Sequence, residues 1–298
     1  MTWPPADESQ LESAGTDYAA LCTAIEKLNT GGNAAIGHIV GGRSRGETVA
    51  AIDASWTAFK TRGMRTLNEA CGQLSGAAAT FDGLVLQCKT GIRDVLASAS
   101  VQSIVAAPGA VLTGGASQTA VVAQARSAVR QVLTATAHEL YRTIKDVDAV
   151  LANLEAGLTD GFESGKIAPE QDQGVVIDDD EFAQARSGLG TSTTAFGTAV
   201  GTFRGVAPGR LTSLHGDDVF REAGAAMDRA QETVARKAAE LVQGLDDFAD
   251  KIGLSVASHA SHDQDRRRAF DRLDPGPVPY GPYVPAPTPG GGGAGTGG

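Results

Sequence analysis

Apolar residues recur three and four positions apart along most of the chain, which is the spacing of one face of an α-helix. Asp7, with Gln10 three residues later, resembles a capping box that starts the first helix. We expect this helix to end near Gly31 and Gly32 and to be followed by a flexible stretch up to Gly46. Its apolar positions are Leu11, Ala14, Tyr18, Leu21, Ile25 and Leu28.

A longer apolar stripe follows. It begins with Val49, Ile52, Trp56 and Phe59 and is interrupted near Gly63. It then continues through Leu67, Cys71, Leu74, Ala78, Phe81, Val85, Cys88, Ile92 and Val95. A stripe this long exceeds an average globular helix and predicts a long antiparallel hairpin or bundle. Pro108 and the pair Gly114 and Gly115 predict a break, after which a third helix extends to Leu158.

The second half of the chain repeats its apolar residues at strict intervals of seven. The two stripes are Phe182, Leu189, Phe196 and Phe203, and then Phe220, Met227, Val234, Leu241 and Phe248. Leu214, His215 and Gly216 lie between them and form a predicted turn, in which Gly216 permits a tight bend and Leu214 covers the helix ends. Two helices with matching stripes fold back to bury both, so we expect a helical hairpin. A generic coiled-coil hairpin with no particular role also fits this periodicity.

These patterns predict an all-α protein: an N-terminal long-helix bundle, a C-terminal helical hairpin and a disordered tail. The boundaries we expect are a helical domain at 1–160, a linker at 161–176, the hairpin at 177–268 and the tail at 269–298. The linker segment is rich in Gly, Pro and charge. In the tail, closely spaced prolines and terminal glycines oppose both helix and sheet.

Charge and composition exclude several classes of protein. The net charge of −10 argues against nucleic-acid binding, which relies on clustered Lys and Arg. Cys22, Cys71 and Cys88 have no metal-ligand spacing and fall on apolar stripes, so we interpret them as small buried residues. The N-terminus lacks the pattern of a Sec signal peptide, and no apolar run is long enough for a spanning helix.

No motif in the sequence indicates catalysis. Phosphate-binding loops, dinucleotide-binding glycines and nucleophile elbows are missing from it. His259, His262 and Asp263 lie close enough together for a surface metal site, but a polar helix end explains them better. Likewise, Asp178 to Asp180 fit helix capping better than cation binding. We therefore expect no enzyme, no cofactor, no metal and no small-molecule substrate.

The hairpin resembles the WXG-type helical hairpins of type VII secretion substrates. Those proteins carry Trp-x-Gly in the turn between their helices and a Tyr-x-x-x-Asp/Glu export signal just after the second helix. Here Leu214, His215 and Gly216 stand at the turn, with the Gly kept and the Trp replaced. His259 and Asp263 stand at the export position, with the Asp kept and His in place of Tyr.

The first 160 residues resemble the channel-like N-terminal domain of actinobacterial polymorphic toxins. The matching stretches are "WPPADES" near the start and "APGAVLTGGASQTAVVAQARSAVRQVL" further along. In the toxins an enzymatic domain follows this region, whereas here a Pro/Gly-rich segment follows the hairpin.

The two resemblances imply a non-enzymatic protein of a type VII-like secretion system. It would be secreted or envelope-associated without a Sec signal peptide, and cytoplasmic before export. Its expected partners are a helical-hairpin protein or a second copy of itself, and the secretion ATPase. The alternative is an intracellular structural or scaffolding coiled-coil protein that is never exported.

Overall fold

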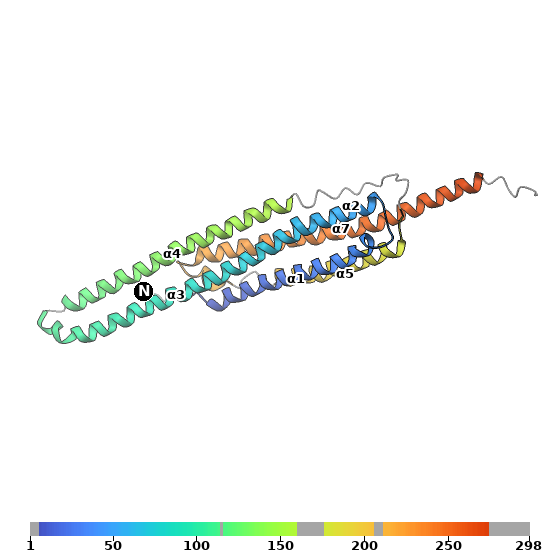
Figure 1. Ribbon diagram of the computed structural model, residues 1–298. Coiled ribbons are helices and arrows are strands. Elements are labelled where there is room, and N and C mark those ends of the chain that lie inside the picture. Colours follow the sequence, from blue (N-terminus) through green and yellow to red (C-terminus); the bar gives the residue numbers. More distant parts are fainter. Residues whose placement is uncertain (1–5, 114–115, 160–175, 206–210, 274–298) are drawn as a thin grey trace, which may run out of the picture. The chain divides into compact units, whose positions relative to one another are not determined.

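The segments with helical periodicity fold as helices in the described part of the chain. The computed structural model describes residues 6–113, 116–159, 176–205 and 211–273 (Figure 1). Its elements in order are α1 (Glu8–Val40), α2 (Glu47–Ala58), the π-helical segment η1 (Phe59–Met64), α3 (Arg65–Thr113), α4 (Ala116–Thr159), α5 (Asp179–Gly205), α6 (Thr212–His215) and α7 (Arg221–Leu273). Across these ranges the β-structure amounts to one isolated bridge between Arg45 and Val176. The predicted all-α class is confirmed.

The chain divides into two compact units, residues 1–256 and residues 257–298. Helix α7 begins in the first unit, and its last residues belong to the second. All contacts between helices given below lie within the first unit.

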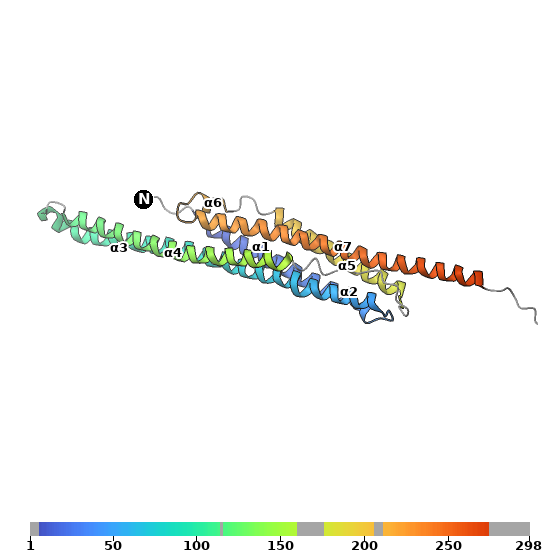
Figure 2. The ribbon, with the colours of Figure 1, turned by 90° about the horizontal axis from the view of Figure 1, so that it is seen from above.

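Helix α1 packs against both α3 and α5, and α3 and α4 lie side by side, as both views of the ribbon show (Figures 1 and 2). The helices before and after the predicted 161–176 linker therefore contact each other. The rings of Tyr18 on α1 and Phe203 on α5 lie 5.3 Å apart between centroids. Those of Phe59 in η1 and Phe248 on α7 lie 5.5 Å apart. Through these aromatic pairs the first half of the chain packs against the second.

Helices α5 and α7 form the predicted helical hairpin. They run antiparallel, since Arg186 pairs with Asp250 while, nearer the turn, Gln231 donates a hydrogen bond to the carbonyl of Phe203. Every residue of the two stripes that repeat at intervals of seven is buried. Phe196 is 1% exposed and Leu241 is 0% exposed. Burial of both stripes is the outcome that the spacing predicts.

The predicted end of the first helix at Gly31 and Gly32 is wrong, as is the flexible stretch after it. Helix α1 continues without interruption to Val40. Gly32 is a packing position: a Cβ atom built on it would lie 2.1 Å from Cη2 of Trp56. The Trp56 indole also donates a hydrogen bond of 2.9 Å to the side chain of Asn33. This packing outweighs the weak helix propensity of glycine.

The predicted break lies between Thr113 and Ala116, where the glycine pair stands in the sequence, and not at Pro108. Helix α3 runs through Pro108 to Thr113, and α4 begins at Ala116. A single proline removes one backbone hydrogen bond, and a long helix retains the bonds on either side. The interruption expected near Gly63 appears as η1, where the helix widens for six residues without ending.

The cysteines are free and lie at the predicted apolar positions. Cys71 and Cys88 are buried, and Cys22 is half-buried. Among the described helices none is long and apolar enough to cross a membrane. The predicted linker and tail lie outside the described residues, except for Val176 and residues 269–273.

Candidate functional site

The turn between α5 and α7 contains a single helical turn, α6. Leu214 lies in it and is 0% exposed, so its side chain is part of the core. Gly216 follows α6 with φ −77° and ψ −9°, which is ordinary right-handed helical backbone. The conformational freedom of glycine, which we expected the turn to need, is not used at this position.

This turn is hydrogen-bonded to the start of α1. The Ser213 hydroxyl accepts a bond of 2.9 Å from the backbone N–H of Asp7 and donates one of 3.0 Å to Oε1 of Gln10. Asp7 caps α1 by accepting from the N–H of Ser9 at 3.0 Å. Gln10 thus bonds the distant turn, and its side chain does not complete the capping box proposed from sequence.

Two further side chains fix the turn to the start of α7. His215 Nε2 lies 2.6 Å from Oδ2 of Asp228, one of the early residues of that helix. Asp217 is 4% exposed. One of its carboxylate oxygens accepts from the N–H groups of Val219 and Phe220 at 2.8 and 3.3 Å. Capping by a short acidic side chain satisfies donors that no helical carbonyl reaches.

Leu214 and Gly216 provide a matched pair of substitutions. Leu214→Ala should lower the free energy of unfolding by about 2–5 kcal/mol, because it leaves a cavity at a fully buried site. Gly216→Ala should change it by less than about 0.5 kcal/mol, because its backbone suits any residue. Chemical denaturation of both variants measures the difference. A large loss on Gly216→Ala would contradict the account of this turn.

His259 and Asp263, at the position of the export signal, both lie on α7. The helix persists through both positions, so residues four apart fall on one helix face. Both belong to the unit formed by residues 257–298.

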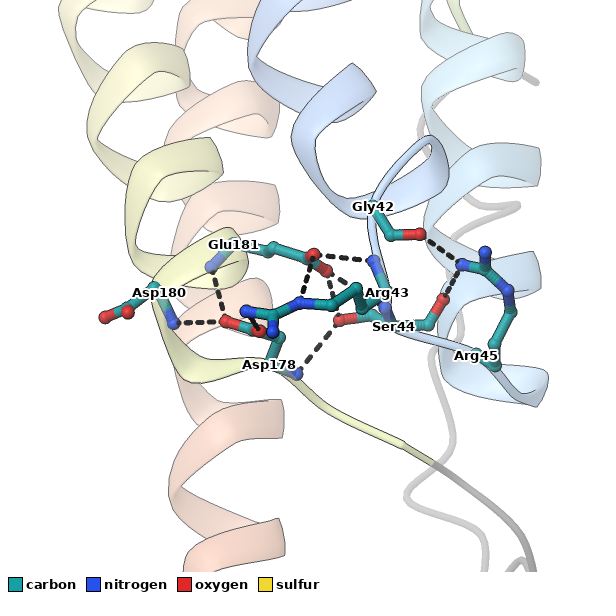
Figure 3. Close-up of polar contacts among 7 residues, drawn as sticks. All are labelled: Gly42, Arg43, Ser44, Arg45, Asp178, Asp180 and Glu181. Carbon is teal, nitrogen blue, oxygen red and sulfur yellow. Dashed lines mark hydrogen bonds and ion pairs between the residues drawn. The ribbon is translucent and has the colours of Figure 1, made fainter.

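A separate cluster joins the start of α5 to the loop between α1 and α2 (Figure 3). We call it the Glu181 clasp; it consists of Arg43, Ser44, Asp178 and Glu181. The Glu181 carboxylate accepts from the N–H of Arg43 at 2.5 Å, from the N–H of Ser44 at 3.0 Å and from the Ser44 hydroxyl at 2.7 Å. The same hydroxyl accepts from the N–H of Asp178 at 3.0 Å. Ser44 is 0% exposed, so the hydroxyl that bonds this loop to the start of α5 is buried.

The clasp also explains the acidic run at the start of α5. Asp178 accepts from the N–H groups of Asp180 and Glu181 at 3.1 and 3.4 Å, which is helix capping, and it pairs with the guanidinium of Arg43. The hydrogen bond from the Arg43 N–H, followed by that from the Ser44 hydroxyl, lowers the pKa of Glu181 from 4.5 to about 2. These donors favour the charged carboxylate.

The lowered pKa makes the clasp sensitive to acid. Because the folded-state pKa is below the ordinary value, the stabilisation is complete above pH 4.5 and is lost as the pH falls toward 2. Glu181→Gln should lower the urea midpoint at neutral pH and reduce the further loss of stability on acidification. Asp180→Asn, on the same turn and exposed, removes an equal charge and is the control. Equal pH profiles for wild type and Glu181→Gln would show that Glu181 contributes nothing.

The local sequence pattern does not predict this clasp. The segment from Gly41 to Gly46 belongs to the stretch predicted to be flexible, and the acidic run at 178–180 predicts helix capping in preference to cation binding. The two segments that meet carry opposite charges: Arg43 and Arg45 lie in the loop, and four acidic residues lie at 178–181. This complementarity is the feature of the sequence that indicates the contact. Which loop meets which helix end is set by tertiary packing of α1 against α5.

The described residues give no support for a reaction centre. Among them, no group of three or more His, Cys, Asp or Glu side chains is placed to hold a metal ion. The one histidine–aspartate pair in the turn, His215 with Asp228, has Ser213 nearby in sequence. The Ser213 hydroxyl, however, donates to Gln10. A serine engaged in this way lacks the hydrogen bond to histidine that nucleophilic catalysis requires.

Comparison with protein-family models gives a match in the first half of the chain. Residues 1–136 match the family model described as a WXG100 like domain. The match lies in α1 to α4, not in the 177–268 hairpin whose turn and export positions carried the WXG resemblance. Neither the curated proteins nor the solved structures provided a match to this chain.

Proposed function

We propose that this chain, whose residues 1–136 are similar to a WXG100-like domain, is a non-enzymatic protein exported by or associated with a type VII-like secretion system. It acts by packing its helices against partner proteins. The observation that carries the proposal is the WXG100-like match in a wholly helical described chain. The resemblance of the toxin N-terminal domains to residues 1–160 is a further expectation that agrees with it.

The way in which α5 packs on α1 supports binding through closely packed helices. A Cβ atom built on Gly188 of α5 would lie 3.1 Å from Cβ of Ala35 on α1. One built on Gly31 of α1 would lie 2.3 Å from the hydroxyl oxygen of Ser192 on α5. Small residues at such contacts let two helix backbones approach closely. We propose that partner contacts, whether to a helical-hairpin protein or to a second copy, use small-residue faces of the same kind.

The stripes of the hairpin itself are not free for a partner. Since all their residues are buried within this chain, a partner binds other faces. Exposed apolar side chains remain on α3, α4 and α7, namely Leu86, Leu96, Val122, Tyr141 and Leu254. The net charge of −10 continues to argue against nucleic acid as the partner.

For export, we propose that the face of α7 bearing His259 and Asp263 is offered to the secretion ATPase. The imidazole ring of His259 is a flat polar group in the place of the phenol, and Asp263 supplies the acidic residue of the signal. The protein is then cytoplasmic before export and secreted or envelope-associated afterwards.

Substitutions on this face test the proposal. His259→Ala or Asp263→Ala should lower the amount of protein exported, while helix content and melting temperature stay those of the wild type. Immunoblots of culture filtrate and circular dichroism provide the two measurements. Glu232→Ala, an exposed charge removed elsewhere on α7, is the control and should leave export unchanged. If both variants are exported like wild type, the signal is wrong and the intracellular scaffold becomes the better account.

A further inference from the structure

Two of the three cysteines face each other between α1 and α3. The Cys22 thiol donates a hydrogen bond of 3.5 Å to the carbonyl oxygen of Asn68, which lies one helical turn before Cys71. The side chains of Cys22 and Cys71 interact, and the interaction shifts the pKa values of the two thiols in opposite directions. Cys22 therefore lies against the turn of α3 that carries Cys71, and a disulfide between two helices requires such proximity.

The two helices are also hydrogen-bonded at Ser75, one turn after Cys71. The Ser75 hydroxyl donates to the carbonyl oxygen of Gly15 at 2.9 Å. A Cβ atom built on Gly15 would lie 3.5 Å from the carbonyl oxygen of Ser75. The hydrogen bond from Ser75 and the ordinary van der Waals spacing at Gly15 hold α1 against α3 close to the cysteine pair.

The two thiols differ in reactivity. The hydrogen bond from Cys71 lowers the pKa of Cys22, which is half-buried. The same bond, together with burial, raises the pKa of Cys71, which is 0% exposed. The thiolate is the reactive form, so a small oxidant in solution meets Cys22 first.

We propose that Cys22 and Cys71 form an intramolecular disulfide that links α1 to α3 when the protein meets a small disulfide oxidant such as oxidised glutathione. The Cys22 thiolate attacks one sulfur of the oxidant, whose S–S bond breaks and releases one glutathione thiolate. Cys71 then loses its proton and attacks the Cys22 sulfur, and the second glutathione leaves. Two cysteine thiols are oxidised, one glutathione disulfide is reduced to two glutathiones, and these take up the two protons.

The disulfide would close the segment of chain between residues 22 and 71, which contains the α1–α2 loop with Arg43 and Ser44 of the Glu181 clasp. A crosslink between residues far apart in sequence restricts the unfolded chain and so raises the melting temperature. The inference does not rest on export, since the thiols react with an oxidant in a purified sample. Export to an oxidising compartment would be one occasion on which the oxidant is met.

Cys88 is the internal control. It is also buried, and burial raises the pKa of its thiol, while its side chain interacts with Thr136 on α4 and not with either of the other cysteines. We therefore expect it to stay reduced while Cys22 and Cys71 react.

The test treats the reduced full-length protein with oxidised glutathione and counts the remaining thiols under denaturing conditions. We expect one thiol to remain and a Cys22–Cys71 linked peptide in a non-reducing digest. The melting temperature should rise, and dithiothreitol should reverse the rise. The Cys88→Ala variant should react like wild type, whereas Cys22→Ser should lose no thiol and gain no stability.

Cys71→Ala separates the two steps, because it should stop with glutathione on Cys22. Three thiols persisting in the oxidised native protein would overturn the proposal, as would a linked peptide containing Cys88 or crosslinks between chains. The melting temperatures of the reduced variants report separately whether each substitution disturbs the fold. If Cys71→Ala does not fold, the wild-type peptide map and Cys22→Ser still decide the result.

Discussion

Phe196→Asp and Leu241→Asp are each expected to unfold the helical core formed by residues 1–256. Both side chains lie on the buried stripes of the α5–α7 hairpin, with exposures of 1% and 0%. A carboxylate placed there loses its water and gains no partner, and large apolar contacts are lost as well. The expected loss is about 4–5 kcal/mol or more, which approaches the whole stability of many domains.

Circular dichroism during urea titration measures this effect, with the neighbouring exposed positions as controls. Ala195→Asp and Gln243→Asp introduce the same charge on the outer faces of the same helices. We expect these two variants to unfold within about 1 kcal/mol of wild type, since Asp has only a modest helix penalty. Cooperative, wild-type-like unfolding of either core variant would mean that the stripes are not buried as described.

Gly32→Val should destabilise the protein more than any other single-glycine change in α1. A Cβ atom at Gly32 would lie 2.1 and 2.4 Å from two ring atoms of Trp56, which is itself 2% exposed. The indole is rigid, buried and hydrogen-bonded to Asn33, so moving it aside costs packing and that hydrogen bond. Even Gly32→Ala should lower the free energy of unfolding by about 1–3 kcal/mol, the usual range for overpacking.

Gly37→Ala is the matched control on the same helix. No atom lies within 4 Å of a Cβ built on Gly37. Alanine is a better helix former than glycine, so this variant should gain up to about 1 kcal/mol. Thermal unfolding followed by circular dichroism compares Gly32→Ala and Gly37→Ala with the wild type. Equal losses at positions 32 and 37 would argue that helix propensity, not contact with Trp56, governs this part of α1.

The parts of the fold that sequence predicts well are those encoded locally. Phe182, Leu189, Phe196 and Phe203 recur at the same interval, and this places them on one face of one helix. That the face is buried follows from the hydrophobic effect alone. The hairpin was therefore predictable, as was the all-α class.

What sequence failed to predict depends on contacts between distant residues. Two consecutive glycines at positions 31 and 32 indicate a helix end, yet they provide space for Trp56 and Ser192. Likewise Gln10 looks like half of a capping box until Ser213 is brought against it. In each case a tertiary contact outweighs a local preference of a few tenths to about one kcal/mol.

Local patterns also explain why the WXG resemblance was seen in the hairpin, whereas the family match falls on the first half of the chain. A seven-residue stripe is common to any pair of packed helices, and Leu214, His215 and Gly216 share only the glycine with the Trp-x-Gly motif. The match to a WXG100 like domain falls on residues 1–136, where Trp56 lies buried against Gly32. A short motif allows many placements along a helical chain, whereas the family model spans α1, α2, α3 and the first part of α4 together.

Fractionation of a native culture tests the central claim, that the protein is a type VII-like secretion substrate or associate, most directly. The account predicts the chain in the culture filtrate or the envelope fraction, and its loss from both when the secretion ATPase is deleted. A cytosolic marker protein, absent from those fractions, controls for lysis. Protein found only with that marker, in amounts unchanged by the deletion, would contradict the account and favour an intracellular scaffold.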